Sequence, residues 1–150
     1  SCPRKFDLIL LSDVLEHLYN PWKVLAGIKD LLSPFGHLLI SVPNLQNLNY
    51  LNAVNSGEFF YQKTGLFDET HIRFFSEKVL KKYLLDAGFS LVNEGWRPDQ
   101  GLKVMENDIR RALSEMEFVN LKFGNLTIEI SKSSIDRYFG QQVLMCATHE

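Results

Sequence analysis

Two acidic residues and a histidine follow the first apolar run of the chain at a spacing that could bind a metal ion. Asp13, Glu16 and His17 stand at positions i, i+3 and i+4. A helical turn would place their side chains on one face. Two carboxylates and an imidazole offer mainly oxygen ligands, as Mg²⁺ prefers. The spacing makes these residues candidate Mg²⁺ ligands, with local capping and packing as the alternative.

Two histidines are candidate general bases. His17 and His71 carry imidazoles, which titrate near neutral pH and can accept a proton from a reacting hydroxyl or amine. A reaction with a good nucleophile can also proceed by alignment alone, without any base. We therefore keep both roles open for these two side chains.

The first elements place these residues at the edge of a predicted parallel sheet. Phe6 to Leu11 is an apolar run typical of a strand buried on both faces, and Leu38 to Val42 is a second one. Between them, Asn20 and Pro21 are typical of a helix start, and Val24, Leu25, Ile28, Leu31 and Leu32 share one helical face. Together they predict a right-handed βαβ unit. Ligands of such sheets lie at the carboxyl ends of strands, where Ser12 and Asp13 follow the first strand.

Residues 44–75 are rich in Asn, Gly and aromatic residues, with one short predicted helix at 48–55. We expect a lid or binding loop here. The aromatic side chains could form the wall of a substrate pocket or pack in the core. They are Phe59, Phe60, Tyr61, Phe67, Phe74 and Phe75.

Alternating helical and strand patterns continue to the end of the chain. Ser76 is predicted to cap a helix that stops before Gly88. Gly88 itself is expected to adopt the left-handed conformation that follows many helix ends. Further elements are predicted as a strand at 89–96, a helix at 102–116, a half-exposed strand at 126–130, a short helix at 134–139 and a final strand at 142–148. No internal repeat or linker is visible, so we expect a single domain over residues 1–150.

Composition excludes several classes of protein. The 150 residues are 45% hydrophobic and 23% charged, the mixture of a globular domain. The net charge is −2 with scattered basic residues, so no nucleic-acid partner is expected. No long apolar stretch predicts a membrane span. Cys2 and Cys146 form no Cys-x-x-Cys pair, which argues against a thiolate zinc site or a disulfide framework and favours a reducing cytoplasm.

Three segments together resemble class I S-adenosylmethionine-dependent methyltransferases. Residues 6–18 read FDLILLSDVLEHL, similar to the fourth strand of that family and the turn after it. Residues 41–44 read SVPN, similar to the end of its fifth strand, and residues 71–76 read HIRFFS, similar to a later segment. The resemblance covers about the first two thirds of the chain, and residues 97–140 match nothing known to us.

The resemblance implies an α/β fold: the C-terminal part of a Rossmann-like sheet, mostly parallel with an antiparallel last strand, and a helix and strand insertion before that strand. It implies that Ser12, Asp13 and Val14 border S-adenosylmethionine. The implied reaction is methyl transfer to oxygen or nitrogen of a small molecule such as a sugar, lipid or quinone. Quinone-biosynthesis O-methyltransferases share the Leu-Glu-His segment, which implies a metal-binding role for Asp13, Glu16 and His17.

One feature of the resembled family is missing from the sequence. The Gly-rich cofactor turn after a first strand has no counterpart, because no two glycines are separated by a single residue. We therefore expect a partial methyltransferase-like domain that lacks its N-terminal half and binds the cofactor weakly, with an inactive chain as the result. The edge of the strand at 6–11 would then be exposed, which predicts a homodimer.

Two other interpretations stay open. A methyltransferase-like fold that lost its cofactor half would serve as a non-catalytic interaction or oligomerisation domain. A βαβ unit also occurs in nicotinamide-dependent dehydrogenases. A wholly parallel sheet would favour the dehydrogenase, whereas an antiparallel last strand beside the 38–42 strand would favour the methyltransferase.

Overall fold

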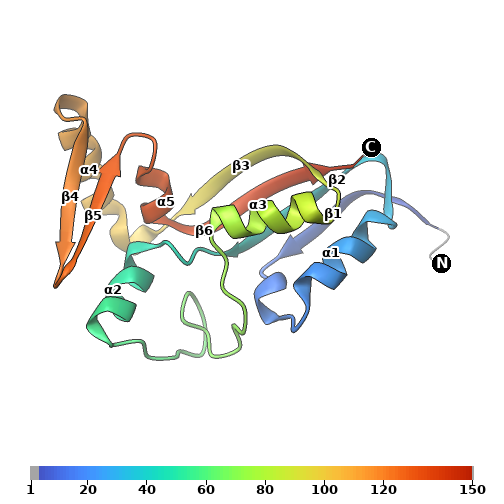
Figure 1. Cartoon of the computed structure of the whole chain (residues 1–150), viewed down its shortest axis with the longest axis horizontal. Coiled ribbons are helices and arrows are strands. Elements are labelled where there is room, and N and C mark those ends of the chain that lie inside the picture. The colour runs from blue at the N-terminus through green and yellow to red at the C-terminus, as the bar shows by residue number, and fades with distance from the viewer. Residues whose placement is uncertain (1–3, 150) are drawn as a thin grey trace. The chain divides into compact units, whose positions relative to one another are not determined.

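The computed structural model describes residues 4–149, which form two compact units (Figure 1). Among the described residues, the first unit comprises residues 4–43, 70–95 and 143–149, and the second comprises residues 44–69 and 96–142. Cys2 lies outside the described residues. The single domain expected over residues 1–150 stays a prediction.

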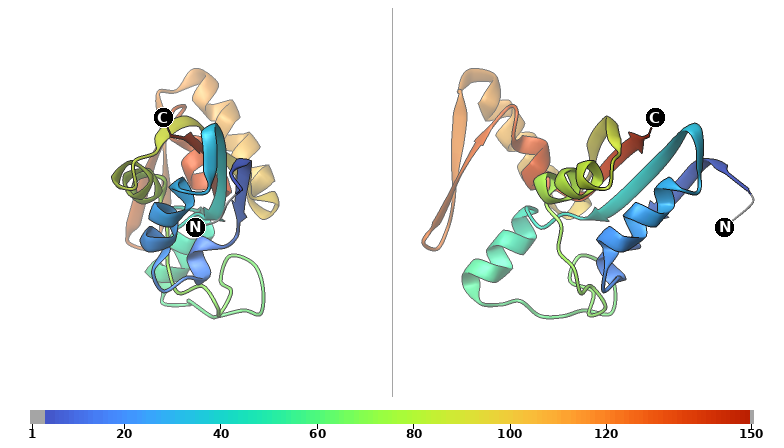
Figure 2. Two further views of the ribbon diagram at one scale, coloured as in Figure 1. Left: turned by 90° about the vertical axis from the view of Figure 1, so that its right-hand side faces the viewer. Right: turned by 45° about the vertical axis from the view of Figure 1, so that its right-hand side comes forward.

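A four-stranded sheet is the frame of the fold. Its strands are β1 (Phe6–Ser12), β2 (Leu32–Pro43), β6 (Gly140–Thr148) and β3 (Ser90–Pro98), in that spatial order. β1 and β2 are parallel, and in Figures 1 and 2 the β6 arrow runs against β2, its neighbour. The predicted α/β sheet with an antiparallel last strand is thus confirmed. The wholly parallel sheet that would favour a dehydrogenase is not formed.

The helix α1 (Pro21–Lys29) connects β1 to β2 and begins as predicted. The Asn20 side chain accepts a hydrogen bond from the Lys23 amide at 3.0 Å, and Pro21 occupies the first turn. The prediction that the helical face continues to Leu31 and Leu32 was wrong. The Phe6 amide donates to the Leu31 carbonyl at 2.8 Å, so the chain has already joined the sheet there and Leu32 opens β2.

The helix α3 (Glu77–Asp86) confirms both of its predicted boundaries. Ser76 accepts a hydrogen bond from the Val79 amide at 3.4 Å, and Gly88 has φ 81° after the helix end. Leu80 and Leu84 are completely buried. The helix therefore presents an apolar face to the core of the first unit.

The expected burial of β1 on both faces was wrong. Three side chains that alternate along the strand, and therefore share one face, are largely exposed: Phe6 is 45% exposed, Leu8 56% and Leu10 63%. β1 is the end strand of the sheet, with β2 as its partner. The apolar run was correct for a strand, but an end strand with one open face does not need complete burial.

The second unit is built from short elements around its own apolar core. It contains α2 (Leu48–Ser56), the 3₁₀ turn η2 (Gln100–Leu102), α4 (Lys103–Glu115), β4 (Phe118–Phe123), β5 (Leu126–Ser131) and α5 (Ile135–Phe139). β4 and β5 form an antiparallel hairpin, and β4 was not predicted. The core residues are Leu48, Ile109, Leu113, Ile128, Ile130, Ile135 and Phe139. Within residues 4–149, every helix is too short or too polar to cross a bilayer.

Candidate functional site

The carboxyl ends of β1 and β2 lie side by side, as the βαβ pattern predicts. Ser12 is in register with Ser41, and their hydroxyl oxygens are 3.0 Å apart. The Asp13 amide donates to the Ser41 carbonyl at 3.1 Å, and the Ser12 hydroxyl also lies 3.4 Å from Asp13 Oδ2. A small polar cluster therefore marks the sheet end where ligands of α/β folds bind.

Asp13 turns the chain sharply as it leaves β1. Its φ of 52° is in the left-handed region, which aspartate tolerates better than most residues. The following helix is a single 3₁₀ turn, η1 (Leu15–His17), with Val14 as its N-cap. The expected helical turn from Asp13 to His17 is therefore not formed, because the backbone reverses its hand at Asp13.

Three potential metal ligands meet in the first unit: Glu16, His17 and His71. Their ligand atoms all lie within 4.8 Å of one another, with Glu16 and His71 buried and His17 exposed. The two imidazole rings are 4.9 Å apart in an edge-to-face arrangement. Asp13 does not belong to this group, whereas His71, which the sequence suggested only as a base, does.

The backbone after residue 69 holds His71 against η1. The Ile72 and Arg73 amides both donate to the Glu16 carbonyl, at 2.9 and 3.0 Å. His17 Nδ1 lies 3.2 Å from the Thr70 carbonyl and 3.0 Å from the Thr70 hydroxyl. If Nδ1 of His17 carries the hydrogen and donates it to the carbonyl, the lone pair on Nε2 is left to accept a proton or to bind a metal. Thr70 was missed by sequence reasoning, because its role depends on this long-range contact.

The donor types in this group fit some metals better than others. Two imidazoles and one carboxylate are typical ligands of Zn²⁺ and Fe²⁺. Mg²⁺ instead prefers oxygen ligands and water. The set Glu16, His17 and His71 therefore fits a first-row transition metal better than the magnesium expected from Asp13, Glu16 and His17.

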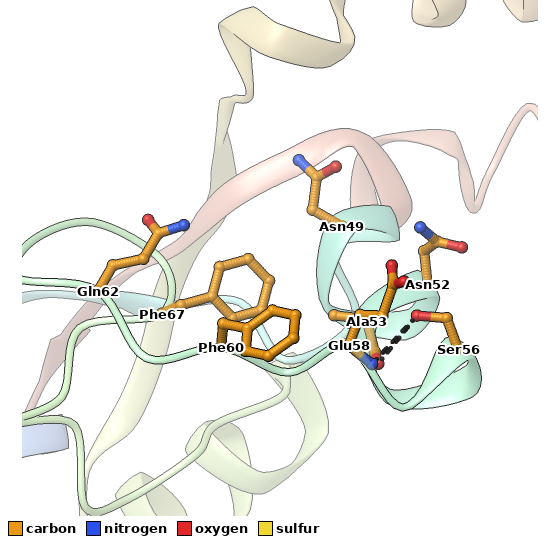
Figure 3. A pocket seen from close by; sticks show the side chains of 8 residues that line it. All are labelled: Asn49, Asn52, Ala53, Ser56, Glu58, Phe60, Gln62 and Phe67. Carbon is orange, nitrogen blue, oxygen red and sulfur yellow. Dashed lines mark hydrogen bonds between the residues drawn. The ribbon is translucent and has the colours of Figure 1, made fainter.

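A separate pocket lies in the second unit beside α2 (Figure 3). Of the aromatic residues expected to wall a pocket, Phe60 and Phe67 line it. Phe75, in contrast, is 2% exposed and packs in the core. The pocket also has polar lining from α2 that the sequence did not single out, although three polar residues at helical spacing are a readable signal.

The family comparison matches residues 2–94 to a model described as a methyltransferase domain. Ubiquinone biosynthesis O-methyltransferases are also similar to this chain, over 54–60% of its residues in two of them. The enzyme of Burkholderia pseudomallei is 27% identical over 90 residues, which cover 60% of this chain and 39% of that protein. The enzyme of Dechloromonas aromatica is 28% identical over 81 residues, 54% of this chain and 35% of that protein. The chain thus spans less than half the length of these relatives.

Solved structures share the fold over nearly the whole chain. An S-adenosylmethionine-dependent methyltransferase from Archaeoglobus fulgidus has a TM-score of 0.57 at 18% identity, covering 97% of this chain and 61% of that one. Another from Clostridium acetobutylicum has a TM-score of 0.55 at 13% identity, covering 99% and 60%. The family model matches more than half of the residues and the fold agrees, so this chain belongs to the class I S-adenosylmethionine-dependent methyltransferase family.

Proposed function

We propose that the protein transfers a methyl group from S-adenosylmethionine to oxygen or nitrogen of a small molecule, a sugar, lipid or quinone. The observation that carries this proposal is the polar end of β1 and β2 within the family match at residues 2–94. Ser12, Asp13 and Val14 would border the cofactor there. The positive φ of Asp13 supports the assignment, because strained backbone often occurs at ligand sites.

The cofactor supplies a methyl group on a sulfonium, and the protein aligns the acceptor. The acceptor oxygen or nitrogen forms the new bond to the methyl carbon while the carbon–sulfur bond breaks, and the electron pair of that bond stays on sulfur. The acceptor proton must then leave. We propose His17 or His71 as its acceptor, because their rings lie together at 4.9 Å in the same unit as Ser12.

We also propose that Glu16 and His17 bind a divalent metal ion. The expected partner of this pair was Asp13, and Mg²⁺ the expected ion. The grouping of Glu16 with His17 and His71 within 4.8 Å supports a transition metal instead. An imidazole that binds a metal cannot accept a proton through the same nitrogen. The metal role and the base role of each histidine are therefore alternatives at that atom.

Calorimetric titration of S-adenosylhomocysteine tests the proposed function. The product is titrated into this chain, into a version of the protein extended to the length of its relatives, and into the Ser12→Ala variant of each. We expect binding by the extended version, weaker binding by its Ser12→Ala variant and little by this chain alone. Absence of binding in the extended version would contradict methyl transfer and favour the non-catalytic interaction domain.

We propose a homodimer formed through β1. The exposed side chains of Phe6, Leu8 and Leu10 form an apolar row on an end strand, which is a template for strand pairing with a second copy. Sedimentation equilibrium should show a dimer, and a Leu8→Lys, Leu10→Lys double variant should shift it to monomer. A monomer at high concentration in the parent protein would contradict this proposal.

We propose the cytoplasm as the compartment of the protein. Cys146 is a free cysteine in the described residues, which is compatible with a reducing environment. Fractionation of the source cells with an antibody against the chain tests this. Recovery in a secreted or membrane fraction would contradict it.

A further inference from the structure

The pocket beside α2 has a chemically mixed lining (Figure 3). Its volume is about 200 Å³, which is smaller than the roughly 300–1,000 Å³ of sites for drug-sized ligands. One part of the lining is polar and the other aromatic. The lining residues are Asn49, Asn52, Ala53, Ser56, Glu58, Phe60, Gln62 and Phe67.

The polar wall is one face of α2. Asn49, Asn52, Ala53 and Ser56 recur at intervals of three, one and three residues, which places them in a row along the helix. Ala53 contributes a small side chain to the same row. Ser56 Oγ accepts a hydrogen bond from the Glu58 amide at 3.3 Å, as drawn in Figure 3, so the chain after the helix is tied to the same wall.

The aromatic wall is held in place by its neighbours. Phe67 packs against Tyr50 at 4.9 Å and against Phe59 at 5.1 Å between ring centroids. The backbone amide of Gln62 donates to the backbone carbonyl of Phe67 at 2.9 Å, which holds these two lining residues together across a loop. Phe60 is 72% exposed at the same pocket. An aromatic side chain that solvent contacts so freely contributes little to the core.

The lining selects a ligand class. It contains one carboxylate, Glu58, and no lysine, arginine or histidine, so a phosphate or carboxylate ligand would find no positive partner. Three amides, one hydroxyl and one carboxylate line the pocket. Asn49 Nδ2 already donates to Asp99 Oδ2 at 3.1 Å, and the Ser56 hydroxyl donates to the Ala53 carbonyl at 3.3 Å. The remaining donors and acceptors favour a ligand with several polar groups, because an apolar ligand would desolvate them without replacement bonds. The C–H face of a saturated ring can lie against an aromatic side chain, whose ring face is electron-rich.

We propose that this pocket binds a single neutral polyhydroxylated ring, a sugar unit. The amides of α2 and Gln62 bond its hydroxyl groups, and the aromatic side chains contact its apolar face. Binding of such a ring in this pocket does not depend on the proposed function.

Two-dimensional ¹⁵N NMR of the chain tests the proposal with methyl hexosides and pentosides as probes, and with catechol and inorganic phosphate as comparison ligands. Resonances of residues 49–67 should shift with at least one glycoside at millimolar concentration. Phe60→Ala and Asn52→Ala should each weaken that binding about tenfold, which corresponds to roughly 1.4 kcal/mol. Val54→Ala is the matched control, because Val54 lies on the same helix, is 65% exposed and does not line the pocket.

Each other result would overturn the proposal. These results are no shift with any glycoside, stronger binding of catechol or phosphate, and equal weakening by Val54→Ala. The titration with S-adenosylhomocysteine is independent of this measurement. Cofactor binding without glycoside binding would remove the sugar subsite alone, and glycoside binding without cofactor binding would remove the proposed methyl transfer alone.

Discussion

Single residues in this protein acquire their chemistry from distant neighbours. Glu16 and His17 lie in η1, just after β1, and His71 is more than fifty positions later, yet their ligand atoms lie within 4.8 Å of one another. Hydrogen bonds from the Ile72 and Arg73 amides to the Glu16 carbonyl create this contact. Roles that depend on His71 are therefore testable by substitution at that one position.

Removal of His71 separates the two metal hypotheses. His71→Ala should reduce the affinity for Zn²⁺ by at least about tenfold, since it removes one of three ligands, whereas Asp13→Asn should leave it nearly unchanged. Competition with a chromogenic chelator measures the affinity, and Co²⁺ absorption reports the ligand set.

His37→Ala is the control, because His37 is exposed on β2 outside the group. A loss with Asp13→Asn and none with His71→Ala would instead support the set Asp13, Glu16 and His17.

Two glycines should respond to alanine with opposite signs. Gly88 has φ 81°, and a Cβ there would lie 2.7 Å from Lys29 Nζ, so Gly88→Ala should cost about 1–2 kcal/mol of unfolding free energy. Gly27 lies inside α1 with no atom within 4 Å of the added Cβ, so Gly27→Ala should stabilise by about 0.5–1 kcal/mol. Urea unfolding measures both, and the same sign for both variants would contradict this reading.

At the scale of elements, an ion-pair cluster connects α3 to β3. Lys81 contacts Glu77 at 2.6 Å on its own helix and also Glu94 on β3. Burial lowers the pKa of Lys81, but hydrogen bonds and charge interactions with Glu77 and Glu94 together outweigh it, and the pKa is raised above its usual 10.5. The ammonium therefore stabilises the helix and strand together.

This shift predicts a pH dependence of stability. Because the folded-state pKa is raised, the contribution of Lys81 is complete below pH 10.5 and is lost as the pH rises through the folded-state pKa. Lys81→Met should then lose less stability than the parent protein between about pH 9 and about pH 11. Urea unfolding at both pH values measures the difference. Lys78→Met on the exposed side of α3 is the control, and equal losses in all three proteins would contradict the prediction.

At the scale of the whole molecule, the two tryptophans report on different units. Trp22 lies in the first unit and Trp96 in the second. If residues 1–150 form a single domain, both units unfold in one cooperative transition. The Trp22→Phe variant reports on Trp96, and the Trp96→Phe variant reports on Trp22. In each variant, the unfolding curve measured by tryptophan fluorescence should then have the same midpoint and slope as the curve measured by circular dichroism. Two separate midpoints within one variant, by fluorescence and by circular dichroism, would show two independent domains.

Much of the fold follows from local patterns. The cap at Asn20, the cap at Ser76 and the left-handed Gly88 are local features, and all three are as predicted. β4 was not predicted, although Phe118 to Phe123 alternates in burial, because a strand of six residues is stabilised by its pairing with β5. A local pattern of six residues does not indicate whether a partner strand is present.

The sequence by itself determined most of the element types, though not β4, and also the βαβ unit and the meeting of Ser12 with the end of β2. Apolar periodicity and caps act over a few residues, so they can be recognised locally. Only the tertiary structure decided that β1 stays exposed on one face, that Asp13 leaves the helical turn and that His71 joins Glu16 and His17. It also placed Phe60 and Phe67 opposite the polar face of α2. Burial and side-chain encounters depend on contacts between distant segments, which no local pattern encodes.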